Sequence, residues 1–103
     1  MPAHADVLRV LRAEGEVPVV VALTEPAGYG DQGVDMDRIR AEIARTQADV
    51  LASLDTTDYR SRTLFASIPA MAGVVLSERG LEQLLANPHV ERVDVDPEGT
   101  GTR

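Results

Sequence analysis

The sequence has no cysteine and no tryptophan, and only three of its 103 residues are aromatic. The absence of cysteine excludes a disulfide framework and a thiolate zinc site. With so few aromatic rings, a folded core has to consist mainly of aliphatic side chains, and these are available because 44% of the residues are hydrophobic. A chain of this length fits one domain, which can bury about two thirds of the surface that the unfolded chain exposes.

Positive charge is also scarce. Seventeen Asp and Glu residues outnumber ten basic residues, all of which are arginine, and the net charge is −7. Nucleic acids and anionic membrane surfaces attract clustered positive charge, so neither is an expected partner. The longest apolar run, residues 17–23, is far shorter than the roughly 20 residues of a membrane-spanning helix. The N-terminus lacks the charged start and apolar centre of a secretory signal, which leaves a cytosolic chain or a signal outside this sequence.

Hydrophobic periodicity predicts a β-α-β-β-α-β order preceded by a short helix. The predicted elements are a helix at 5–13, a strand at 17–23, a helix at 35–54, strands at 62–68 and 71–76, a helix at 77–86 and a final strand that ends at 96. This order is typical of the ferredoxin-like α+β fold, a sandwich of a four-stranded antiparallel sheet with two helices on one face. The strand at 17–23 is apolar on both sides, although two helices can cover only one face. We therefore expect the other face to meet solvent or a partner.

Two local patterns have an alternative interpretation as ligand sites. Residues 28–33 match the dinucleotide pattern G-x-G-x-x-G, but four residues separate them from the preceding strand, and nearby aspartates would repel a pyrophosphate. Asp31, Asp35 and Asp37 lack the bidentate glutamate of a calcium loop, and Asp35 is better placed to cap the helix that follows. His4 and His89 are far apart in the sequence and predict no metal site or catalytic triad. We expect no enzyme and no cofactor.

The second half of the chain carries a series of elements with a family resemblance. They are Phe65, Ala70–Gly73, Leu76-Ser77-Glu78, Leu81 with Leu84, Asn87-Pro88-His89-Val90, and Val93–Asp96. In this order and spacing the chain, over about residues 17–98, resembles the propeptide (inhibitor) domain of subtilisin-like serine proteases. The resemblance implies an N-terminal helical extension at 1–16, a ferredoxin-like inhibitor domain at 17–96 and a flexible C-terminal tail at 97–103.

The resemblance also implies a function and a partner. The chain would act as intramolecular chaperone and inhibitor of a subtilisin-like serine protease catalytic domain, in cis or in trans, and would be secreted with it. It would bind through the open sheet face and the tail, with Asp94 and Asp96 capping two surface helices of the protease. The other protease-binding residues that it implies are Glu98, Gly99, Thr100, Gly101, Thr102 and Arg103. On its own, this acidic series equally fits a solvated strand that protects a sheet edge.

The tail departs from the family pattern at one point. The protease subsites favour an apolar residue a few places before the end, where this chain has Gly99, Thr100 and Gly101. We therefore expect modest rather than very tight inhibition. The alternative from another class is a small-molecule-binding or oligomerising ferredoxin-like module unrelated to proteolysis, because this fold carries many functions.

Overall fold

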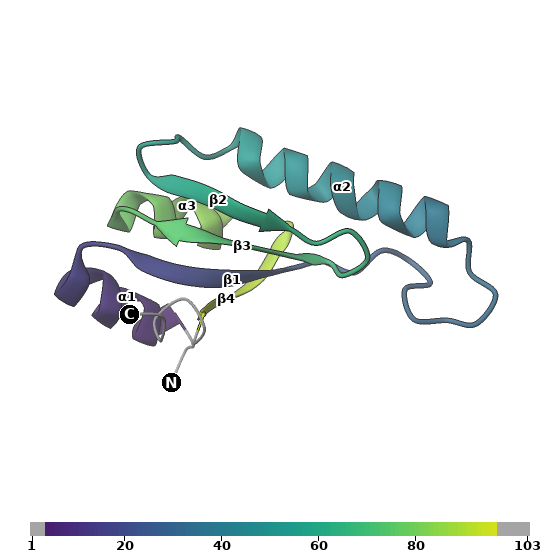
Figure 1. The fold of residues 1–103 in the computed structure, drawn as a ribbon, viewed down its shortest axis with the longest axis horizontal. Coiled ribbons are helices and arrows are strands. Elements are labelled where there is room, and N and C mark those ends of the chain that lie inside the picture. Colours follow the sequence, from purple (N-terminus) through teal and green to yellow (C-terminus); the bar gives the residue numbers. More distant parts are fainter. Residues whose placement is uncertain (1–3, 97–103) are drawn as a thin grey trace.

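The computed structural model describes residues 4–96, and its element order is the predicted one (Figure 1). The elements are α1 (His4–Glu14), β1 (Val17–Leu23), α2 (Met36–Ala52), β2 (Tyr59–Leu64), β3 (Ala70–Val75), α3 (Glu78–Ala86) and β4 (Val90–Val95). The predicted α+β class is confirmed. The tail at 97–103 lies outside the described residues, and with it Glu98 and the residues that follow.

The four strands form one sheet in the order β2-β3-β1-β4, and every neighbouring pair is antiparallel. Val21 of β1 lies directly across from Met71 of β3 on one side and from Val93 of β4 on the other. The β2–β3 register shifts between Ser61 and Thr63, which is a bulge in an edge strand. This is the ferredoxin-like strand order, with the N-terminal strand in the centre.

All three helices pack on one face of the sheet. A single hydrophobic cluster joins Val7 of α1, Val50 of α2 and Leu84 of α3 to alternate residues of β1 that begin with Val17. α1 lies beside β1 and β4 and also contacts α3 (Figure 1). The sequence predicted two helices on this face plus a short N-terminal helix, and the structure places that third helix in the same layer. The opposite face carries none of the helices in residues 4–96.

Helices α2 and α3 each begin at a capping side chain, and the sequence predicted the one at Asp35. The Asp35 side chain accepts hydrogen bonds from the backbone N–H groups of Asp37 and Arg38, at 3.0 and 3.4 Å. The Ser77 hydroxyl accepts the N–H of Gly80 at 3.1 Å. Each side chain satisfies donors that the first turn of a helix leaves without a partner. Helix capping therefore accounts for Asp35.

The predicted strand at 62–68 was wrong in its boundaries, because β2 spans Tyr59–Leu64. The buried side chain of Gln47 donates hydrogen bonds to the carbonyls of Phe65 and Ala70, both at 2.9 Å. These hydrogen bonds hold residues 65–69 as the loop between β2 and β3. The alternation of apolar and polar residues in this segment had predicted a strand instead. Gln47 lies among apolar residues on the buried side of α2, and this contact explains its position.

Candidate functional site

The sheet face without helices is the candidate site. Residues directly opposite each other in an antiparallel pair point to the same side of the sheet, so the register identifies its members. We call this surface the open face, and it consists of Pro18, Val20, Ala22, Arg60, Thr63, Ala70, Ala72, Val74, Arg92 and Asp94.

The open face has a small apolar centre and charged edges. Val74 of β3 is only 3% exposed and Ala72 is 9% exposed, so the β3 part of the centre leaves almost no area to solvent. Val20 of β1 is partly buried, whereas Arg60 on β2 and Arg92 on β4 are exposed. In the centre of the open face, only the β1 side chains therefore leave apolar area open to a partner.

Asp94 lies on the β4 edge of the open face, directly across from Val20. The guanidinium of Arg92, two residues earlier on the same face, donates a hydrogen bond through Nε to the Asp94 carboxylate. This hydrogen bond, with the charge of Asp94, raises the pKa of Arg92 above its usual value. Both side chains are well exposed, at 62% and 39%, so the pair contributes little to folding and can exchange partners.

Asp96 continues the ladder one residue beyond β4. Its backbone N–H donates to the Pro18 carbonyl at 2.9 Å, which keeps the segment extended along β1. Successive side chains of an extended segment alternate between faces, so Asp94 and Asp96 share the open face and the intervening Val95 turns toward the core cluster. The structure thus brings two of the predicted site residues together at one edge. The others, Glu98, Gly99, Thr100, Gly101, Thr102 and Arg103, lie outside the described residues.

The two histidines stay apart from this site. The imidazole Nε2 of His89 lies 4.0 Å from a carboxylate oxygen of Asp49, and His4 is exposed at the start of α1. Within residues 4–96, no group of three or more His, Cys, Asp or Glu side chains is arranged to hold a metal ion. In the same residues, no helix is both long and apolar enough to cross a bilayer.

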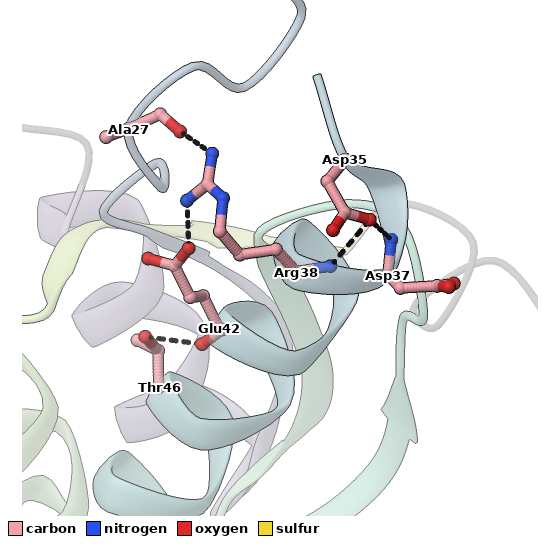
Figure 2. A network of polar contacts seen from close by, with 6 residues as sticks. All are labelled: Ala27, Asp35, Asp37, Arg38, Glu42 and Thr46. Atoms are coloured by element: carbon pink, nitrogen blue, oxygen red, sulfur yellow. Dashed lines mark hydrogen bonds and ion pairs between the residues drawn. The ribbon is translucent and has the colours of Figure 1, made fainter. Parts of the chain in front are cut away.

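The glycine-rich loop is anchored by its own helix, as Figure 2 shows. The guanidinium of Arg38 donates to the Ala27 carbonyl at 2.9 Å and pairs with the carboxylate of Glu42 one turn further along α2. Gly28, which lies beside this anchor, has a φ of 82°, a left-handed conformation that favours glycine. The Asp35 carboxylate occupies the first turn of α2, where a phosphate would need to sit.

Sequence reasoning missed a second polar cluster, which lies on the helix side of the sheet. Asp58 is 8% exposed, and its carboxylate accepts the Ser77 hydroxyl at 2.7 Å while its backbone carbonyl accepts the N–H of Leu76 at 2.8 Å. A Cβ on Gly80 would collide with that same carbonyl. The cluster ties the start of β2 to the cap of α3, so its role is structural. The sequence showed only a polar connection there.

No protein-family model matches this chain, and comparisons with curated proteins and with solved structures gave no match either. A function is therefore inferred from the open face and from the residues of its β4 edge.

Proposed function

We propose that this chain is a propeptide-type chaperone and inhibitor of a subtilisin-like serine protease. It would bind the protease through the open face and the C-terminal tail. The observation that carries the proposal is the position of Asp94 and Asp96, which alternate along the end of the last strand at the edge of a sheet face that carries no described helix. The identity of the partner is inferred from the resemblance of residues 17–98 to such propeptides.

The chemistry of this edge suits the N-termini of helices. A helix start presents N–H groups without intrahelical partners and a positive partial charge, and a carboxylate satisfies both. Asp94 would exchange the Arg92 guanidinium for such N–H groups, in bonds that become stronger as the interface excludes water. Two carboxylates spaced two residues apart along a strand are about 7 Å apart, so they could cap two neighbouring helices.

The apolar centre would supply the contact area between the two caps. Helices laid across the open face would cover Pro18, Val20 and Ala22, the partly buried residues of β1. Burial of apolar surface stabilises such a contact by about 25 cal/mol per Å². Because the open face is already held in place by the sheet, binding loses little conformational entropy on this side of the interface. Such a preformed surface is suited to guide the folding of a partner.

The tail would determine the strength of inhibition. Residues 97–103 follow directly from the β4 edge and would enter the active-site cleft after Asp94 and Asp96 dock. Because Gly99, Thr100 and Gly101 offer no apolar anchor, we expect inhibition to be modest. Removing residues 97–103 should abolish competitive inhibition while leaving the melting temperature nearly unchanged.

The test is an inhibition assay against a panel of subtilisin-like proteases. The native chain should inhibit at least one of them, and Asp94→Asn with Asp96→Asn should raise that inhibition constant by at least about tenfold. The matched control is Asp37→Asn with Asp49→Asn, which neutralises two exposed carboxylates of α2 and should leave inhibition unchanged. A native chain that inhibits none of the panel, or an edge variant that inhibits as well as the native chain, would contradict the proposal.

The alternative of a module unrelated to proteolysis has one observation in its favour. The partly buried side chains of Pro18, Val20 and Ala22 leave apolar area open on a face without a described helix, and a small molecule or another subunit would cover that area as a protease would.

A further inference from the structure

We propose that α1 is a positioning element for the β4 edge of the open face. Val7 and Leu11 of α1 hold the last strand in place from the helix side, so that Asp94 and Asp96 keep their spacing along the edge. The positioning concerns the fold alone, whereas its effect on inhibition rests on the proposed protease binding. This assigns a role to the N-terminal extension, which the family resemblance leaves outside the inhibitor domain.

β4 is an edge strand, so a backbone ladder holds it on one side only. That ladder is with β1, and the N–H of Asp96 continues it to the Pro18 carbonyl at 2.9 Å. The direction of N–H groups alternates along a strand, so the N–H of Asp94 also points toward β1. A strand with few contacts opens at a lower free energy than a central one, and the open face of β4 carries no described helix. The remaining support for β4 therefore comes from the helix layer.

α1 supplies a large part of that support. It contacts β4, β1 and α3, whereas the strand that α2 contacts most is β3 (Figure 1). Val7 and Leu11, 0% and 4% exposed, belong to the same hydrophobic cluster as Val93 of β4, and Val95 packs against this cluster. Val93 and Val95 alternate along β4 with the residues of the open face. Their packing against the cluster thus fixes the direction of the carboxylates on the other side.

One ion pair joins α1 to the start of α3. The guanidinium of Arg12 donates two hydrogen bonds to the Glu78 carboxylate, from Nε at 3.0 Å and from Nη2 at 3.3 Å. Both side chains are exposed, at 63% and 49%, so the pair adds little to the stability of the domain as a whole. A substitution at Arg12 therefore alters the docking of α1 without removing a side chain from the core.

A loosely held β4 would weaken the docking of both carboxylates. Hydrogen bonds to the N–H groups of a helix start require each carboxylate to lie within a narrow range of positions. A strand that moves in the free protein also has to become ordered when the protease binds, and this ordering lowers the affinity. Support from α1 removes that cost before binding. Loss of general stability opens all strands together, whereas loss of this support opens β4 first.

Amide hydrogen exchange measured by NMR tests the positioning. Leu11→Ala should speed the exchange of the Asp94 and Asp96 amides at least about tenfold relative to the amides of β3, a central strand paired on both sides. Ile43→Ala is the matched control, because Ile43 is an aliphatic residue of α2 that is 1% exposed. This control should speed exchange in β3 at least as much as at Asp94 and Asp96.

Arg12→Glu tests the same positioning with the core intact, and it decides the question if Leu11→Ala does not fold. The variant places a second carboxylate beside Glu78 and should speed exchange at Asp94 and Asp96 about three- to fivefold, with β3 unchanged. Arg12→Lys keeps the positive charge and should stay within about twofold of the native rates. Equal acceleration of β4 and β3 in Leu11→Ala, or native rates in Arg12→Glu, would overturn the positioning role.

Inhibition assays test the effect on binding. Against a protease that the native chain inhibits, Leu11→Ala should raise the inhibition constant at least about fivefold, and Ile43→Ala should raise it less than about twofold. A Leu11→Ala variant that opens β4 yet inhibits as well as the native chain would overturn the link between α1 and binding. A native chain that inhibits no protease of the panel contradicts the proposed function instead, and the exchange rates then decide on the positioning by themselves.

Discussion

Replacing Gly73 with alanine should destabilise the domain strongly, because the core side of β3 has no room for a side chain at that position. Tyr59 crosses the sheet over Gly73, and an added Cβ would collide with the Tyr59 hydroxyl oxygen and Cζ. It would also lie 2.6 Å from the backbone carbonyl oxygen of Arg60. A ring atom can move by rotation of the side chain, whereas the carbonyl belongs to the paired strand β2 and can move only with it.

The cost follows from the two ways in which the clash can be relieved. Expelling the Tyr59 ring, which is 3% exposed, would return a large apolar surface to water. Shifting β2 away from β3 instead costs about 1 to 3 kcal/mol, the usual range for an overpacked core. Because the backbone contact adds to the ring contact, we expect a loss of about 2 to 4 kcal/mol in the free energy of unfolding.

Urea unfolding followed by far-UV circular dichroism measures this loss, since the chain has no tryptophan to report on the core. Thr63→Ala, at an exposed position of β2, is the control and should change stability by less than about 0.5 kcal/mol. In a Tyr59→Leu background, Gly73→Ala should cost less, because two of the three colliding atoms are then absent. A loss below about 0.5 kcal/mol, or strict additivity of the two substitutions, would refute the packing argument.

Two further substitutions test the buried polar groups Gln47 and Tyr59. Gln47→Leu should lower the free energy of unfolding in urea by about 2 to 3 kcal/mol, because it removes the hydrogen bonds to the carbonyls of Phe65 and Ala70. An unchanged unfolding midpoint would mean that water replaces the Gln47 amide as their hydrogen-bond partner. Burial raises the pKa of Tyr59 from 10.0 to about 12, so the unfolded chain loses its phenol proton before the folded protein does. Stability should therefore be unaffected by this group below about pH 10 and should fall between about pH 10 and 12, by at most about 1.4 kcal/mol per pH unit. Tyr59→Phe should remove that fall, and two parallel pH profiles would show that Tyr59 is solvated in the folded state.

Local signals predicted the elements whose stabilising contacts are local. The caps at Asp35 and Ser77 are formed within three residues of the side chain, and Pro88 stops α3 because it cannot continue the ladder of the helix. The order of helices and strands along the chain follows in the same way from the succession of periodic segments. Such features are visible in a short window of sequence.

The boundaries of β2 depend on contacts between distant residues, and the sequence could not give them. Gln47 sets the hairpin loop from 18 and 23 residues away, through Phe65 and Ala70. The pairing of Arg92 with Asp94 was also missed. Alternation predicts which face a side chain takes, but which neighbour it bonds depends on the rotamers of both partners.

The central claim is that the open face binds the protease, and methyl NMR of the domain tests it most directly. The domain would be titrated with an inhibited subtilisin-like protease from the panel, whose catalytic serine is replaced so that the tail is not cleaved. If the protease binds the open face, the methyl signals of Val20, Ala22 and Ala72 shift or broaden, whereas that of Leu85, which is 41% exposed on α3 in the helix layer, stays in place. Changes confined to Leu85 and other helix-layer methyl groups, or no change at saturating protease, would contradict the account.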